Sequence, residues 1–125
     1  MNRSITRTAT CAVIGAALLA PAAAQAAPPK KLTAGVGPGF TITLKNAAGK
    51  KVTSLKAGAY TIVVVDRASN HNFHLIGRGV NKKTGLAFKG TLNGARAWKV
   101  TFRKGTYRYV CDPHALAMKG SFRVV

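Results

Sequence analysis

The sequence predicts an all-β domain, a Greek-key β-sandwich in which two sheets pack face to face. Three observations favour this class. Several short segments alternate apolar and polar side chains with the period of two that is typical of half-buried strands. Turns that contain glycine separate these segments at short intervals. No segment repeats its apolar residues at the spacing of an amphipathic helix.

The expected strands, in chain order, cover residues 40–44, 61–66, 71–76, 97–102, 106–111 and 121–125. The second of them is continuously β-branched, which is typical of a strand inside a sandwich core. Residues 32–40 are rich in Gly and are expected to form a loop, and residues 77–90 are expected to form a loop with a short helical turn. The final strand should complete a sheet, so its removal should disrupt the strand pairing of that sheet.

Two segments resemble each other at an offset of 47 residues. Residues 55–64 (LKAGAYTIVV) and residues 102–111 (FRKGTYRYVC) both carry an apolar residue, a basic residue, a Gly and a Tyr before a strand. Two copies are too few for a repeat array. We therefore expect two similar turn-to-strand corners, one in each half of the sandwich, which Tyr60 and Tyr107 pin.

The first residues have the features of a secretory signal peptide. Arg3 and Arg7 precede a mostly apolar run over residues 9–20, which is too short for a membrane span, and residues 24–26 (Ala-Gln-Ala) form a cleavage site. We expect a periplasmic or extracellular protein. The expected organisation is a signal peptide over residues 1–26, a linker and loop over residues 27–39, and a single domain over residues 40–125.

The chain is strongly basic. After cleavage it would keep 99 residues with 18 Lys and Arg against two acids, Asp66 and Asp112, which is a net charge of +16. Such a charge favours a partner with an acidic docking surface or association with an anionic membrane surface. The alternative is that the basic residues only form a solvent-exposed outer face and bind no partner. We expect a monomer.

One loop carries three soft or borderline metal donors. Residues 111–118 (Cys-Asp-Pro-His-Ala-Leu-Ala-Met) place a thiolate, an imidazole and a thioether close together. Cys111 would be the only cysteine after cleavage, and a lone thiol in an oxidising compartment needs to be buried or bound. Sulfur donors favour Cu(I), and imidazole suits both oxidation states of copper. The loop therefore predicts a copper site, and the alternative is a buried core cysteine without a metal.

A second imidazole can come only from His71 or His74. In an extended segment residues 71, 73 and 75 share one face, and Phe73 and Leu75 should face the core. His71 should then point inward as the ligand, while His74 should point outward with Asn72 as a surface histidine. Asn72 is also expected to form a hydrogen bond across to the cysteine loop.

These motifs resemble those of the plastocyanin/azurin (cupredoxin) family of small blue copper proteins. His71-Asn72 resembles the His-Asn pair that follows the core strand in plastocyanins. Residues 111–118 resemble the Cys-x-x-His-x-Met loop that precedes the last strand of that family. The resemblance covers most of the chain after residue 26, loosely outside these two motifs.

The resemblance implies a cupredoxin-like fold and one type 1 copper ion, with His71, Cys111 and His114 as equatorial ligands and Met118 as a weak axial ligand. Three residues separate His114 from Met118, a spacing between those of plastocyanins and amicyanins, so the resemblance leaves the axial bond length open. Ala115, Leu116 and the loop at residues 35–40 are expected to form a small apolar docking patch around His114.

The donor set favours electron transfer. A trigonal site on a rigid sandwich is a compromise between the geometries of Cu(II) and Cu(I), so it rearranges little on electron transfer. We expect a carrier of single electrons between redox partners rather than an enzyme. Three histidines are too few for the further copper centre of a multicopper oxidase, and the only acids, Asp66 and Asp112, do not form a catalytic carboxylate pair. One alternative is a copper carrier or buffer with the same ligands. A remoter one is a basic nucleic-acid-binding β-barrel, against which the export signal argues.

Overall fold

The computed structural model describes residues 23–25, 27–86 and 96–125. Most of the expected signal peptide, residues 1–22 and 26, lies outside the described residues. So does the segment of residues 87–95, which includes the end of the loop expected over residues 77–90.

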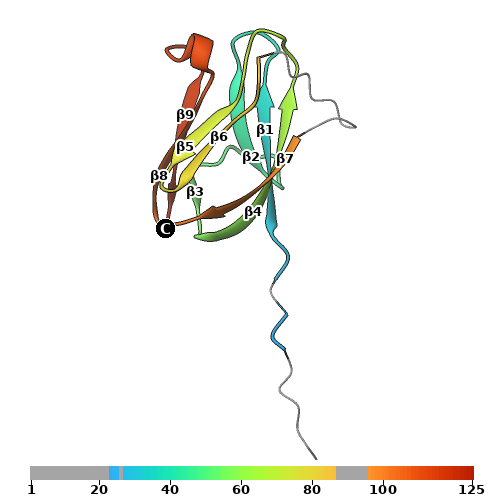
Figure 1. The fold of residues 1–125 in the computed structure, drawn as a ribbon, viewed down its shortest axis with the longest axis vertical. Coiled ribbons are helices and arrows are strands. Elements are labelled where there is room, and N and C mark those ends of the chain that lie inside the picture. Colours follow the sequence, from blue (N-terminus) through green and yellow to red (C-terminus); the bar gives the residue numbers. More distant parts are fainter. Residues whose placement is uncertain (1–22, 26, 87–95) are drawn as a thin grey trace, which may run out of the picture.

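Two sheets pack face to face in the described part of the chain, which confirms the predicted all-β sandwich (Figure 1). The four-stranded sheet contains, in spatial order, β2 (Ile42–Asn46), β1 (Lys30–Val36), β4 (Gly58–Asp66) and β7 (Arg96–Phe102). The five-stranded sheet contains β3 (Ser54–Leu55), β9 (Lys119–Val124), β8 (Gly105–Val110), β5 (His74–Gly77) and β6 (Val80–Lys83). Most neighbours are antiparallel, but β1 pairs with β4 and β3 pairs with β9 in parallel.

Alternation along the strands builds the core between the sheets. In β4 every second side chain is buried, from Tyr60 to Asp66, while the side chains between them are partly exposed or exposed. Aromatic rings fill one end of this core. Phe102 lies edge-on to Tyr107 and Phe122, with ring centroids 4.9 and 5.4 Å away, and this arrangement suits the ring quadrupoles.

The two predicted corners are present and alike. The Tyr60 hydroxyl donates a hydrogen bond to the carbonyl of Lys56 at 2.8 Å, and the Tyr107 hydroxyl donates to the carbonyl of Arg103 at 2.9 Å. The glycine in each corner has a positive φ, 140° at Gly58 and 150° at Gly105, which disfavours any side chain there. The offset repeat therefore reflects two tyrosine-pinned entries into strands.

The prediction of a loop over residues 32–40, and of a linker over residues 27–39, is wrong where β1 lies. β1 is an inner strand between β2 and β4, and it buries Leu32, Ala34 and Val36. Its alternation is carried partly by Ala and Gly, which have low intrinsic strand preference, so pairing with two neighbours decides its conformation.

Two further strand assignments need correction. The segment expected as a loop over residues 77–90 contains β6, an edge strand that pairs with β5 and buries only Val80. The strand expected over residues 71–76 begins only at His74, and residues 71–73 belong to the β4–β5 connection. The two-residue β3 was not predicted, since its order comes from pairing with β9.

The strand directions bring three connections to one end of the sandwich. β1, β4 and β8 all end there, so the β1–β2, β4–β5 and β8–β9 connections lie close together, with a short 3₁₀ turn, η1 (Asp112–His114), in the last of them (Figure 1). We call this the metal end. The described residues before β1 approach the domain from the opposite end (Figure 1).

Candidate metal centre

Three donor atoms converge at the metal end. His71 comes from the β4–β5 connection, Cys111 directly follows β8, and His114 lies in η1. The Sγ of Cys111 lies 3.7 Å from Nδ1 of His71 and 3.6 Å from Nδ1 of His114, and the two Nδ1 atoms are 2.9 Å apart. Among the described residues, these three form the group of His, Cys or acidic side chains whose ligand atoms lie close enough together to hold one metal ion.

The donors differ in exposure. Cys111 is a fully buried free thiol and His71 is 2% exposed, whereas His114 is half-buried. A thiolate with two imidazoles is the trigonal donor set of blue copper sites, so the residues present fit a copper ion. The half-buried imidazole of His114 gives the site one edge close to solvent.

The loop from β8 to β9 is closed by its own backbone. The N–H of His114 donates to the carbonyl of Cys111 at 3.0 Å, and the N–H of Met118 donates to the carbonyl of His114 at 2.8 Å. The N–H of Cys111 in turn donates to the carbonyl of Met118 at 3.0 Å. Pro113 fits the start of η1 because that position needs no N–H donor. Met118 is fully buried, and these bonds tie its backbone to the two candidate ligands of this loop, Cys111 and His114.

Asn72 links the histidine segment to the cysteine loop, as predicted. Its backbone N–H points at the Sγ of Cys111 at 3.4 Å. Its side chain exchanges two hydrogen bonds of 2.8 Å with Asp112: the amide donates to the carboxylate, and the backbone N–H of Asp112 donates to the amide oxygen. The expectation that the side chain of Asn72 points outward is wrong, because Asn72 is buried between the two segments.

His74 lies outside the donor group but is not a free surface histidine, which corrects the prediction. Its side chain is only 16% exposed and forms a hydrogen bond with Asp112, with Nδ1 and the carboxylate oxygen 2.7 Å apart. Its Nε2 lies 2.7 Å from the side-chain oxygen of Asn81 on β6. The relevant signal in the sequence was the position of Asp112, one of only two acids, between the candidate ligands Cys111 and His114.

These contacts shift the ionisation of Asp112. Partial burial opposes its charged form, but hydrogen bonds from His74 and Asn72 and the nearby positive charge of Lys83 prevail. Together they hold the pKa of Asp112 below its usual value. The carboxylate therefore remains an acceptor beside the donor group at neutral pH.

Exposed apolar side chains lie beside His114, both in the β1–β2 connection and directly after η1. The ring of Phe40, 63% exposed, lies 5.0 Å from the ring of His114 and 5.5 Å from that of His71, measured between centroids. Leu116 is 91% exposed beside η1. Phe40 and Leu116 with Ala115 form what we call the apolar rim.

Comparison with known proteins agrees with this geometry. The family model of copper-binding proteins of the plastocyanin/azurin family matches residues 36–125. A search of curated protein sequences found no match.

Among solved structures, reduced rusticyanin has 21% sequence identity and a TM-score of 0.56, with 76% of this chain and 78% of that chain covered. Rusticyanin from Thiobacillus ferrooxidans has 22% identity and a TM-score of 0.53, with 76% of each chain covered. A chain of a heme-copper terminal oxidase dimer has 20% identity and a TM-score of 0.52, with 76% of this chain and 63% of that chain covered. At these identities the likeness shows a shared fold. The family match spans both sheets and all three converging donors, and the chain belongs to the plastocyanin/azurin family of copper-binding proteins.

Proposed function

We propose that this protein is an exported type 1 copper protein that passes single electrons between redox partners. The observation that carries the proposal is the convergence of one thiol sulfur and two imidazole nitrogens within 4.8 Å of one another in a family of copper-binding proteins. His71, Cys111 and His114 would hold the ion, and the thioether of Met118 would be a further, weaker donor. Bound copper supplies one-electron chemistry through its Cu(II) and Cu(I) states.

The surrounding residues prepare the ligands. Cys111 must lose its proton to bind a metal. The backbone N–H of Asn72 lies 3.4 Å from its sulfur and holds that sulfur in place beside His71. The bonds between Asn72 and Asp112 fix the distance between the segment of His71 and the loop of Cys111. Ligands held this way need little rearrangement when the charge of the site changes.

The apolar rim is the proposed docking surface for redox partners. It surrounds the half-buried edge of His114, so a partner that covers Phe40 and Leu116 comes close to a ligand of the site. A patch of this kind suits a brief encounter rather than a permanent complex. The net charge favours partners whose own docking surface is acidic.

The test is the absorption spectrum of the protein loaded with Cu(II), beside the variants Cys111→Ala, His71→Ala and His74→Ala. We expect an intense visible band from thiolate-to-copper charge transfer in the wild type and in His74→Ala. The band should be absent from Cys111→Ala and absent or strongly changed in His71→Ala. A colourless wild type that binds Cu(II) would contradict the proposal. Loss of the band in His74→Ala but not in His71→Ala would assign the ligand role to His74 instead of His71.

A copper carrier with the same ligands is the competing function. Burial of Cys111, His71 and Met118 favours a resident ion, because a carrier must expose its donors to pass the metal on. Transfer of copper from the loaded protein to a chelator should therefore be slow relative to its electron exchange. Rapid copper transfer and slow electron exchange would reverse this assignment.

Export is the part of the proposal that concerns residues 1–26. Among the residues that the structure describes, no helix has the length and apolar character needed to cross a bilayer. Expression of the full chain in a bacterium should give an exported protein whose mass corresponds to a start at Ala27. Retention of residues 1–26 would contradict the proposed cleavage.

A further inference from the structure

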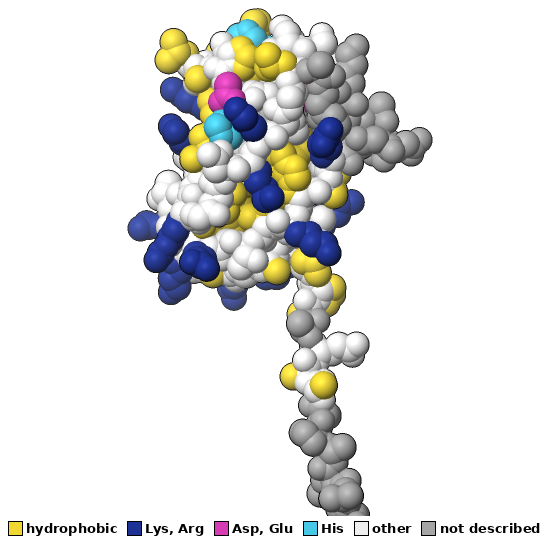
Figure 2. Space-filling model, viewed as in Figure 1, with side chains coloured by type: hydrophobic (Ala, Val, Ile, Leu, Met, Phe, Trp, Pro, Cys, Tyr) yellow, Lys and Arg dark blue, Asp and Glu magenta, His cyan; other side chains and the backbone are white. Residues whose placement is uncertain are grey.

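The basic residues are unevenly placed on the molecule. Six exposed cations lie where strands begin or turn at the end opposite the metal end: Lys30, Lys31, Lys56, Arg78, Arg103 and Lys104. We call this group the basic pole. Figure 2 shows dark-blue side chains crowded at the lower end of the domain, while the acidic and histidine side chains in view lie toward the upper end.

No carboxylate side chain can neutralise the basic pole. The whole sequence contains two acids, and both lie at the other end of the sandwich. Asp66 is buried at the end of β4, and Asp112 is bonded to His74 and Asn72 beside the donor group. The charged side chains of the pole are therefore all cationic, and charged side chains are distributed asymmetrically between the two ends of the domain.

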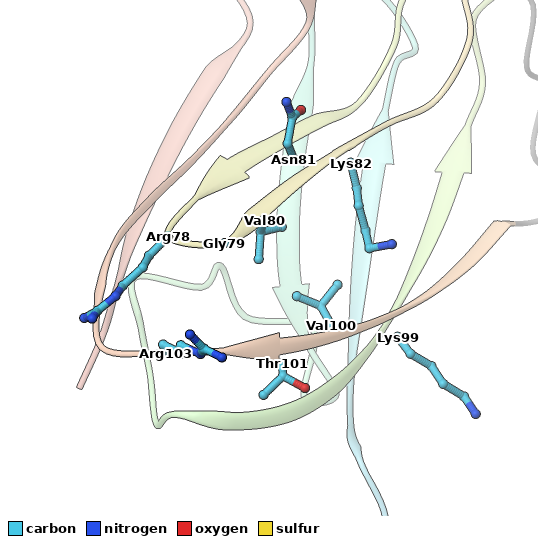
Figure 3. A pocket seen from close by; sticks show the side chains of 9 residues that line it. All are labelled: Arg78, Gly79, Val80, Asn81, Lys82, Lys99, Val100, Thr101 and Arg103. Atoms are coloured by element: carbon cyan, nitrogen blue, oxygen red, sulfur yellow. The ribbon is translucent and has the colours of Figure 1, made fainter.

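A cleft with a cationic rim opens at this pole. It has a volume of about 460 Å³ and lies between β6 and β7, the edge strands of the two sheets. Val80 and Val100 line its interior between these strands (Figure 3). Arg78, Lys99 and Arg103 lie around the cleft, with the cationic ends of Arg78 and Lys99 directed outward (Figure 3). Such a rim suits contact with several phosphate groups spread over a surface.

The N-terminal segment leaves the domain at the same pole. β1 begins at Lys30, and the described residues before it lead away from that end (Figure 1). The sequence places an apolar run at residues 9–20, which export would insert in the membrane. About ten residues connect that run to β1, so the basic pole would be the end of the domain nearest the bilayer until the proposed cleavage after residue 26. After cleavage only the charge of the pole would hold it there.

We propose that the basic pole binds the surface of an anionic phospholipid membrane and so leaves the metal end facing away from the bilayer. The lipid phosphates supply the negative charge that the chain lacks at this end. The apolar rim stays accessible to redox partners in this orientation. The binding itself does not depend on copper, so it can succeed or fail independently of the proposed electron transfer.

The test uses the exported protein with vesicles of phosphatidylcholine that contain a minor fraction of phosphatidylglycerol. The pole variant Lys56→Gln/Arg103→Gln/Lys104→Gln is compared with the control Arg67→Gln/Lys83→Gln/Lys119→Gln, which removes equal charge at the metal end. Each Lys or Arg near an anionic surface strengthens binding about fivefold. The pole variant should bind about 100-fold more weakly than the wild type in co-sedimentation, and the control should lose less than about tenfold. Equal losses would overturn the proposal, because net charge alone would then explain binding.

Lysine acetylation of the wild type provides a second test that needs no variant. In the vesicle-bound protein, Lys30, Lys31, Lys56 and Lys104 should be protected, while Lys83 and Lys119 should react as in the free protein. Protection of Lys83 and Lys119 instead would reverse the orientation and overturn the proposal. Absence of binding to the mixed vesicles, or equal binding to pure phosphatidylcholine, would also overturn it.

Inorganic phosphate distinguishes a membrane surface from a site for a free anion. Phosphate and chloride at equal ionic strength should release the protein from vesicles equally, because both only screen the surface field. Release at a much lower concentration of phosphate would assign the pole to a discrete phosphate site and contradict membrane binding.

Discussion

The side chain of Asn72 joins the two segments that carry the candidate ligands. It bonds to a backbone N–H and a carboxylate oxygen of Asp112, and its own N–H points at the sulfur of Cys111. One residue therefore holds together two segments that lie 40 positions apart in the chain. An alanine at this position would leave the buried N–H of the loop without its acceptor.

The first prediction is that Asn72→Ala lowers the free energy of unfolding of the metal-free protein by about 2 kcal/mol, since two hydrogen bonds, one of them to a charged group, are lost. Urea denaturation measures this change. Asn70→Ala, at an exposed asparagine in the same connection, is the matched control and should change stability by less than about 0.5 kcal/mol. Equal effects of the two substitutions would show that the cross-link contributes nothing.

The second prediction concerns the pH dependence of the metal-free protein. The pKa of Asp112 is lower in the folded than in the unfolded chain, since hydrogen bonds and His74 outweigh its partial burial. Its charge therefore stabilises the fold above the unfolded pKa of about 3.9, and this stabilisation is lost as the pH falls through the folded pKa. The stability difference between wild type and Asp112→Asn should shrink as the pH falls below the unfolded pKa of Asp112 toward its folded pKa. Denaturation curves at several pH values measure it, and a difference that grows on acidification would contradict the sign.

At the scale of elements, the two corners show how a short motif fixes the entry to a strand. In both corners a glycine of positive φ begins the strand that carries the tyrosine. The tyrosine hydroxyl then donates to the carbonyl four residues earlier in the chain. Tyr107 is bound more extensively, because its oxygen also accepts the N–H of Arg103 at 3.1 Å and lies 3.2 Å from the carbonyl of Arg78. The corner before β8 thus ties together two turns at the basic pole.

We therefore predict that Tyr107→Phe lowers the free energy of unfolding by about 2–3 kcal/mol, whereas Tyr60→Phe lowers it by about 1 kcal/mol. The extra cost comes from the backbone N–H of Arg103 and the carbonyl of Arg78, which lose a partner that has no counterpart at Tyr60. Equilibrium urea unfolding of both variants measures the difference. A larger loss for Tyr60→Phe would show that the second turn adds nothing to the corner.

At the scale of the whole molecule, the basic pole and the apolar rim occupy opposite ends. Charges separated by more than the Debye length are screened from each other, and this length falls from about 30 Å at 0.01 M salt to about 8 Å at 0.15 M. The pole should therefore steer reagents toward the molecule only at low ionic strength, while the rim decides contact at every ionic strength.

A salt dependence follows for electron exchange of the copper-loaded protein. Its rate constant with an anionic reagent such as hexacyanoferrate should fall about tenfold between 0.01 and 0.15 M salt, because attraction to the net positive charge is screened. The rate constant with a cationic cobalt complex should rise over the same range. Stopped-flow absorbance measures both, and the same direction for both reagents would contradict electrostatic steering.

The sequence by itself determined the features that neighbouring residues encode. The cysteine loop places its donors within eight positions, and the corners repeat a six-residue pattern, so neither needed a tertiary partner to be recognised. The period-two argument predicted that His71 faces the core together with Phe73 and Leu75, and all three side chains are buried. The ligand role of Met118 stays a prediction that its burial and backbone bonds support.

Only the tertiary structure decided what depends on partners distant in the chain. β1 and β6 have weak strand patterns and are ordered by pairing with β4 and β5. The contact of His74 with Asp112 joins residues 38 positions apart, so no local pattern could encode it. The gathering of dispersed basic residues into one pole follows from strand direction, because alternate turns of a sandwich lie at opposite ends. Local periodicity records which way a side chain faces, whereas strand pairing decides which distant side chains meet.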